Sequence, residues 1–131
     1  MGPLVLIVDD NERNAKLARD VLEAAGMSTL SAATALDGLL LAREHRPDLV
    51  LLDLRLPDLG GLEAARRLRA DGTTADIPVV ALSATRIDDA RSGEECFDGY
   101  IEKPIDVGEF PAQVRRHCTR TRPPRTGKLP P

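Results

Sequence analysis

The stretch DLVLLDLRLPDLGG, residues 48–61, predicts the fold class of this chain. Its first half is an apolar run that ends on an acid, Asp53, as is typical of a parallel strand that is buried on both faces. Its second half contains Pro57, Asp58 and the pair Gly60-Gly61, a composition that favours a turn leading into a helix. A buried strand, a short turn and a helix together make one unit of an α/β protein.

Units of the same kind are predicted on both sides of this stretch. The predicted strands are LVLIV (4–8), MSTLSAA (27–33), DLVLLD (48–53), IPVVALS (77–83) and GYIEK (99–103). The predicted helices begin after a cap at Asn11, at about Ala35, after Gly61, within 85–96 and after Asp106. Because successive units of this type are joined by right-handed crossovers, we expect a five-stranded, doubly wound parallel sheet with helices on both faces. In the helix over 35–45, the residues Leu36, Leu39 and Leu40 are expected to form one apolar face.

Length and composition indicate a single domain with a core made from aliphatic side chains. The chain has 131 residues, 42% of them hydrophobic, and its only aromatic residues are Phe97, Tyr100 and Phe110. Cys96 and Cys118 form no metal-ligand pattern, so we interpret both as small hydrophobic residues and expect no disulfide. No apolar run approaches the roughly 20 residues of a membrane span, and MGPLVLIVDD lacks the features of a signal peptide, so we expect a cytoplasmic protein.

Charge divides the chain into two parts. Residues 1–118 contain all 21 acidic residues and 14 of the 18 basic ones, whereas 119–131 contain four basic residues and no acidic one. We therefore expect a domain over 1–118, followed by a basic, Pro-rich tail over 119–131 that is extended or disordered. An acidic domain argues against direct binding to nucleic acid.

Polar residues lie at the ends of four predicted strands. They are Asp9 and Asp10, Asp53, Ser83 and Lys103. Since the carboxyl ends of parallel strands share one edge of the sheet, and ligands bind there, these side chains are expected to converge. Clustered carboxylates repel one another, and oxygen ligands of this kind favour Mg²⁺, while the Lys103 ammonium would offset part of the remaining charge. Any one of these acids could be a solvated loop residue or a helix cap, but the complete set favours a site.

With these residues, the chain resembles the receiver domains of two-component response regulators, from residue 4 to about residue 118. The resemblance rests on VDDNERN (8–14), LLDLRLPDLGGLE (51–63), VVALSA (79–84) and YIEKPI (100–105). It implies a CheY-like, flavodoxin-like fold with strand order 2-1-3-4-5, and a signalling phosphoacceptor rather than an enzyme. The residues of the first segment and the expected lack of an output domain make the chain most similar to single-domain, DivK-like regulators.

The resemblance also implies roles for individual residues. Asp53 would accept a phosphoryl group from a histidine kinase or a histidine phosphotransfer protein. Asp10, Asp53 and the backbone carbonyl of Arg55 would bind Mg²⁺ directly, and Asp9 would bind it largely through water. Lys103 would pair with Asp53 or with the phosphoryl oxygens, and Ser83 would donate a hydrogen bond to the phosphoryl group. The family also implies a cis peptide bond between Lys103 and Pro104.

Three further implications concern the conformational switch, the lifetime of the acyl phosphate and the length of the segment before Lys103. Tyr100 occupies the position of the family's aromatic switch, although a tyrosine half packed at the sheet edge is an equal alternative from the residue alone. Arg55 and Thr85 would flank the path of the water that hydrolyses the acyl phosphate. We hypothesise that Arg55 covers the phosphoryl group, and an arginine that is simply solvated is a close alternative. The segment between Ser83 and Lys103 is shorter than usual for the family, which leaves the register of the helix within 85–96 open.

Other function classes fit the sequence less well. A phosphatase of the haloacid-dehalogenase type needs a second acid two residues after its nucleophile, where this chain has Arg55. A flavodoxin-like flavin binder needs a phosphate loop after the first strand, and a nucleotide P-loop is absent from the sequence. A receiver-like module that binds proteins without phosphorylation remains the alternative. The expected partners are a kinase or phosphotransfer protein and an unidentified downstream protein, with no membrane, and the chain is expected to be a monomer or a phosphorylation-dependent dimer.

Overall fold

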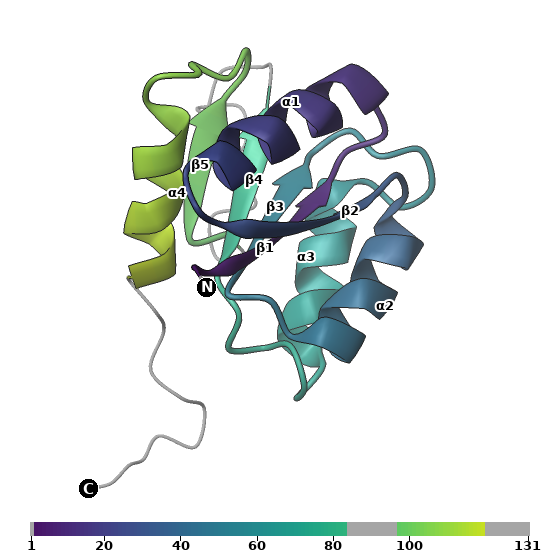
Figure 1. Cartoon of the computed structure of the whole chain (residues 1–131). Coiled ribbons are helices and arrows are strands. Elements are labelled where there is room, and N and C mark those ends of the chain that lie inside the picture. Colours follow the sequence, from purple (N-terminus) through teal and green to yellow (C-terminus); the bar gives the residue numbers. More distant parts are fainter. Residues whose placement is uncertain (1, 84–96, 120–131) are drawn as a thin grey trace, which may run out of the picture.

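The computed structural model describes residues 2–83 and 97–119, which form a five-stranded parallel sheet with helices on both faces (Figure 1). The strand order is β2-β1-β3-β4-β5, as predicted. The strands are β1 (Leu4–Val8), β2 (Ser28–Ala32), β3 (Leu49–Asp53), β4 (Val79–Ser83) and β5 (Gly99–Glu102). The helices are α1 (Glu12–Ala24), α2 (Ala35–His45), α3 (Gly61–Ala70) and α4 (Phe110–Thr119).

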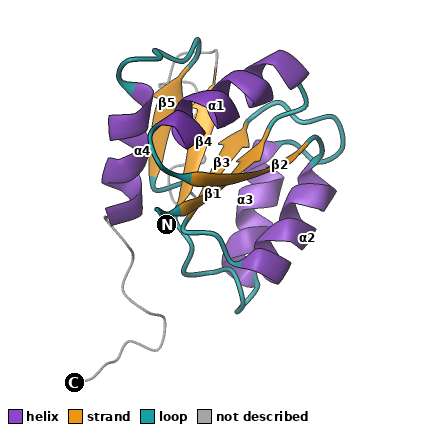
Figure 2. Cartoon of the chain, viewed as in Figure 1, coloured by secondary structure: helices purple, strands orange, loops and turns teal. Residues whose placement is uncertain are grey.

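The sheet separates two hydrophobic layers. Helices α1 and α4 cover one face and α2 and α3 cover the other (Figure 2). Alternate residues of each central strand point to opposite layers: in β1, Val5 and Ile7 pack toward α1 and α4, while Leu6 and Val8 pack toward α2 and α3. The central strands are therefore buried on both faces, which explains their unbroken apolar sequences.

Local signals in the sequence set the ends of the helices. Asn11 caps α1, where its side-chain oxygen accepts a hydrogen bond from the backbone N–H of Asn14, and Thr34 caps α2 in the same way. Gly26 follows the end of α1 with φ of 93°, a left-handed conformation that suits glycine. Arg46, which ends α2, also has a positive φ, of 47°, and no glycine announces this position in the sequence.

The predicted apolar face of α2 is not the face that packs on the sheet. The buried residues of α2 are Ala35, Gly38 and Ala42, whereas Leu36 and Leu40 are 53% and 52% exposed. The reason is a close approach: a Cβ atom on Gly38 would lie 2.8 Å from a methyl carbon of Val8 on β1. Small residues therefore face the sheet, Leu39 and Leu41 are half-buried against the same layer, and Leu36 and Leu40 point outward.

Some predictions concern residues that the structure does not describe. The described ranges exclude the helix expected within 85–96, the residues Thr85 and Cys96, and the tail from residue 120 onward. Within 2–83 and 97–119, no helix has the length and apolar character that crossing a bilayer requires.

Cys118 lies half-buried on α4, where it packs at the edge of the layer formed with α1. Burial, with a smaller contribution from Asp48, raises the pKa of its thiol to about 11. In a Cys96→Ser variant at pH 8, we expect iodoacetamide to alkylate Cys118 about a hundredfold more slowly in the folded protein than in urea, because only the thiolate reacts. Mass spectrometry over time measures both rates, and the folded-state rate should climb with pH toward 11. Equal rates in the two states would contradict the burial of this thiol.

Candidate functional site

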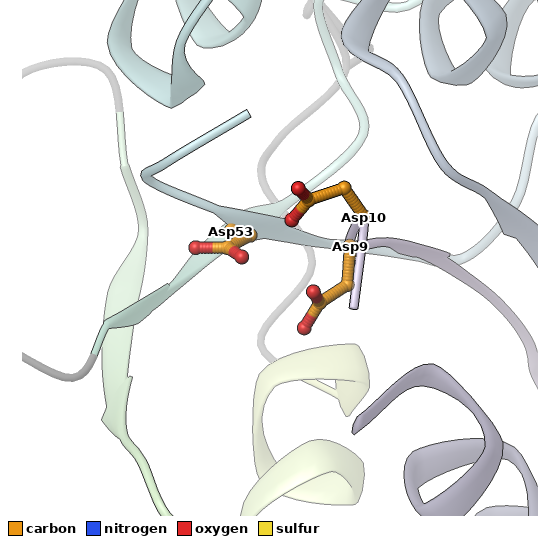
Figure 3. A group of neighbouring side chains, drawn as sticks. All are labelled: Asp9, Asp10 and Asp53. Carbon is orange, nitrogen blue, oxygen red and sulfur yellow. The ribbon is translucent and has the colours of Figure 1, made fainter. Parts of the chain in front are cut away.

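The carboxyl ends of four strands meet at one edge of the sheet, as the sequence predicts. Asp9 and Asp10 follow β1, Asp53 ends β3, Ser83 ends β4 and Lys103 follows β5. Figure 3 shows the three aspartates gathered where the ends of β1 and β3 lie side by side. In the order β2-β1-β3, strand β2 lies on one side of β1 and β3 lies on the other, so the strand order reverses at β1. Ligands usually bind at the carboxyl ends of the strands next to such a reversal.

Lys103 joins the two buried acids. Its Nζ lies 3.0 Å from Oδ2 of Asp9 and 3.2 Å from Oδ2 of Asp53. Its backbone N–H donates to the carbonyl of Ser83 at 2.8 Å, which fixes the start of this loop against β4. The peptide bond between Lys103 and Pro104 is cis, as expected. The lysine therefore lies at the centre of the site, although 50 residues separate it from the nearer acid in the sequence.

The other oxygens of the two acids are held by the backbone. Oδ1 of Asp9 accepts the N–H of Asn11 at 2.9 Å, and Oδ1 of Asp53 accepts the N–H of Arg55 at 3.0 Å. Asp9 and Asp53 are only 3% and 7% exposed, so both carboxylates are buried as well as hydrogen-bonded. Asp10, in contrast, is exposed and faces solvent at the rim.

Burial dominates the electrostatics of Asp53. It raises the pKa of this carboxyl above the ordinary value, although the Arg55 N–H and the Lys103 charge act in the opposite direction. Burial by itself would lower the pKa of Lys103, but its hydrogen bond to Asp9 and the negative charges of both acids raise it overall. Lys103 is therefore charged at neutral pH, and one ammonium does not fully offset the cost of burying the Asp53 carboxylate.

The acids also form a suitable cluster for a metal ion. One carboxylate oxygen from each of Asp9, Asp10 and Asp53 lies within 4.8 Å of the others. An all-oxygen set with one exposed member, open to water, suits Mg²⁺, which keeps several waters when bound to protein. The uncompensated burial of Asp53 is a further reason why a divalent cation fits here. The site opens into a hollow of about 300 Å³ that is lined by Asp10, Asn11, Asn14, Asp53, Leu54, Arg55, Ser83 and Lys103.

Two polar residues of this hollow are not predicted from the sequence as parts of a site. Asn11 was predicted only as the cap of α1, and Asn14 received no role. Because α1 begins directly after Asp10, its first turn necessarily stands beside the acids. That position was a usable signal: a polar, uncharged residue one turn into the helix that follows an acid pair faces whatever the acids bind.

The loop between β3 and α3 is held more firmly than its turn-like composition predicts. Its start is bound to β4, since the N–H of Leu54 donates to the carbonyl of Leu82 at 3.2 Å. Further along, both carboxylate oxygens of Asp58 accept backbone N–H groups at the start of α2, from Ala35 and Leu36, each at 2.9 Å. These hydrogen bonds lower the pKa of Asp58. The loop that presents Asp53 and Arg55 is thus attached to two neighbouring elements.

The remaining predicted residues are only partly placed. Ser83 is 3% exposed at the end of β4 and lines the same hollow as Asp53. Tyr100 lies half-buried on the edge strand β5, with its ring centre 5.6 Å from that of Phe97. This position is compatible with both interpretations of Tyr100 that the sequence left open. Arg55 is exposed at the rim, and Thr85 lies outside the described residues.

Comparison with known proteins agrees with this geometry. The response regulator receiver domain family matches residues 5–115. The polar-differentiation response regulator DivK of Brucella anthropi is 43% identical over 119 residues, which cover 89% of this chain and 97% of that protein. The DivK of Brucella melitensis is 42% identical over the same shares of both chains.

Solved structures give the same result for the fold. The receiver domain of a Pseudomonas aeruginosa sensor histidine kinase, solved with a magnesium ion coordinated in its active-site cleft, superposes with a TM-score of 0.83 and 27% identity, covering 91% of this chain and 99% of that one. A Francisella response regulator receiver domain superposes with a TM-score of 0.82 and 26% identity, covering 91% and 98%.

Proposed function

The chain belongs to the response regulator receiver domain family, and from this premise we propose that it accepts a phosphoryl group on Asp53 in a Mg²⁺-dependent reaction and thereby switches a protein-interaction surface. The donor is the phosphohistidine of a histidine kinase or of a histidine phosphotransfer protein. The receiver unit comprises residues 1–118, and 119–131 form an appended basic tail.

The observation that carries this proposal is the environment of Asp53. Its carboxylate ends a buried strand, its Oδ2 lies 3.2 Å from a lysine ammonium, and two further carboxylates stand close enough to share a cation with it. A structural acid in a sheet needs one partner, whereas this one has a lysine, a backbone N–H and a hollow open to solvent. Such an arrangement is typical of a carboxylate that reacts with a bound group.

Phosphoryl transfer at this site requires an oxygen of Asp53 as the nucleophile. As the new P–O bond forms, the P–N bond of the phosphohistidine breaks, and its electron pair stays on the imidazole nitrogen. Little covalent help is needed in such a transfer, because the reaction depends mainly on positioning and on charge compensation. The backbone N–H of Arg55 fixes one Asp53 oxygen, and this leaves the orientation of the carboxylate defined.

Charge compensation comes from groups already gathered around Asp53. Asp9, Asp10 and the backbone carbonyl of Arg55 would hold Mg²⁺ together with Asp53, and the ion supplies positive charge against the phosphoryl oxygens. Lys103 exchanges its contact with Asp53 for a phosphoryl oxygen, while its contact with Asp9, at 3.0 Å, holds it in place. Ser83 donates its hydroxyl to another phosphoryl oxygen from the end of β4.

The added charge then biases the conformation of the output surface. The acyl phosphate carries about two negative charges where the free Asp53 carboxylate carries one, and it adds new acceptor oxygens. This change is enough to shift a two-state loop. Movement of Ser83 toward the phosphoryl group would be followed by inward rotation of Tyr100 on β5. Arg55 and Thr85 set the lifetime of the acyl phosphate, with Arg55 covering it from the rim. The altered surface binds a downstream protein or a second phosphorylated copy.

Incubation with a small phosphodonor tests the proposal directly. With Mg²⁺ and phosphoramidate, we expect the intact mass to increase by one phosphoryl group, and we expect no increase when a chelator replaces Mg²⁺. Beryllofluoride, which mimics a phosphoryl group on a carboxylate, should raise the melting temperature only when Mg²⁺ is present. If neither reagent has an effect, the chain is a module that binds proteins without phosphorylation.

A further inference from the structure

Asn14 is a polar side chain at the acceptor site to which the proposed function gives no role. It lies half-buried in the first turn of α1 and lines the same hollow as Asp53, Ser83 and Lys103. Its backbone N–H donates to the side chain of Asn11 at 3.1 Å. Within residues 2–83 and 97–119, its carboxamide makes no hydrogen bond, so both its N–H donors and its oxygen are available to a group in the hollow.

The other polar groups on this side of the hollow are already committed. The Asn11 side chain caps α1, the backbone N–H of Arg55 binds Asp53, and Asp10 belongs to the acid cluster. In the proposed function, the oxygens of a phosphoryl group on Asp53 would be contacted by Lys103, by Ser83 and by the metal ion. Arg55 and Thr85 are assigned to the lifetime of the acyl phosphate, with Arg55 covering it from the rim. No protein hydrogen bond is yet assigned to the group in line with the new bond, on the far side of the phosphorus from Asp53.

We propose that the Asn14 carboxamide hydrogen-bonds the group in this in-line position. During phosphorylation the group is the leaving nitrogen of the phosphodonor, and during hydrolysis it is the attacking water. This inference rests on the proposed function, since it needs an acyl phosphate on Asp53.

An amide suits both halves of the cycle because its oxygen can accept a hydrogen bond from the apical group in each. In phosphorylation by phosphoramidate, the P–N bond breaks with its electron pair on nitrogen, ammonia leaves, and an N–H of that nitrogen donates to Oδ1 of Asn14. In hydrolysis, water donates one O–H to the same oxygen while its own oxygen attacks phosphorus. The P–O bond to Asp53 breaks with its electron pair on the Asp53 carboxylate, and the proton that the water loses stays with the released phosphate. Asn14 thus orients the apical group and carries no proton itself.

The test compares Asn14→Ala with wild type in three measurements. Phosphorylation by phosphoramidate and dephosphorylation after removal of the donor should each slow by about two- to tenfold, the worth of one uncharged hydrogen bond. The affinity for beryllofluoride with Mg²⁺ should not change, because beryllofluoride occupies the phosphoryl position and lacks an apical ligand. Alanine is the best helix former, so the variant should fold normally, as thermal unfolding will verify.

Leu17→Ala is the matched control, since Leu17 lies one turn further along α1, is 39% exposed and does not line the hollow. Its rates should equal those of wild type. Unchanged rates in Asn14→Ala would overturn the inference, and so would a parallel loss of beryllofluoride affinity, which would place the amide on the phosphoryl oxygens instead. A wild-type protein that takes up no phosphoryl group would show that the proposed function, rather than the role of Asn14, has failed.

Discussion

Replacement of Asp53 by Asn is expected to abolish formation of the acyl phosphate while preserving the fold. A carboxamide has nearly the shape of a carboxylate, so β3 and its neighbours should pack as before. It offers no anionic oxygen to attack phosphorus, and it weakens the cation site by removing one of three charges. Intact mass after incubation with Mg²⁺ and phosphoramidate should show no phosphoryl adduct in Asp53→Asn under conditions in which wild type is modified.

Asp37→Asn provides a control with the same chemical change elsewhere. Asp37 is exposed in the first turn of α2, away from the acid cluster. This variant should take up a phosphoryl group at the wild-type rate. If Asp53→Asn were still modified to the wild-type extent, another residue would be the acceptor, and the proposed function would be wrong as stated.

The same Asp53→Asn variant should also show a distinct dependence of stability on pH. Burial raises the pKa of Asp53 in the folded protein above its value of 3.8 in the unfolded chain. A carboxyl shifted in this direction stabilises the fold below its unfolded pKa, and this contribution is lost as pH rises through the folded pKa. Without Mg²⁺, urea unfolding should therefore show Asp53→Asn gaining stability relative to wild type as pH rises from 4 to 8. A constant difference across this range would contradict the raised pKa.

The convergence of the site was predictable from the sequence because parallel topology gives the strand ends a fixed relation. Once 4–8, 48–53 and 77–83 are identified as buried strands, the residues that follow them must share one edge. The predicted strand order and the cis bond before Pro104 are confirmed, although they came from the family resemblance and not from the residue pattern. The preference for Mg²⁺, in contrast, was predicted from the chemistry of the oxygen ligands.

Features that depend on how closely two elements approach could not be predicted in this way. The pattern of leucines in α2 suggested the wrong face, because contact with β1 selects Gly38 and small neighbours rather than the most apolar residues. The hydrogen bonds from Asp58 to the start of α2 join residues 22 and 23 positions apart. These hydrogen bonds form only because α2 and α3 pack in one layer, and a local sequence pattern does not predict that packing.

A second close approach gives the largest expected effect outside the acids. Gly61 begins α3 directly beneath the acceptor loop, and a Cβ atom there would lie 2.6 Å from the carbonyl oxygen of Asp53 and 2.7 Å from Cα of Leu54. Both are backbone atoms of the loop that orients the acceptor, so they can yield only if that loop moves. Gly61→Ala is therefore expected to reduce the free energy of unfolding by about 1–3 kcal/mol, the usual cost of overpacking.

The same displacement should impair the chemistry, because an acceptor misplaced by about 1 Å costs on the order of a hundredfold in rate. Urea unfolding and phosphorylation by phosphoramidate, measured on the same Gly61→Ala preparation under folding conditions, should thus both be affected. Gly72→Ala is the control: no heavy atom lies within 4 Å of a Cβ at Gly72, and its φ is not positive. That variant should phosphorylate normally and unfold with unchanged or slightly higher stability. A Gly61→Ala protein that loses stability but phosphorylates at the wild-type rate would show that α3 supports the fold without positioning Asp53, and the orientation of the acceptor would then rest on Arg55 and Lys103 alone.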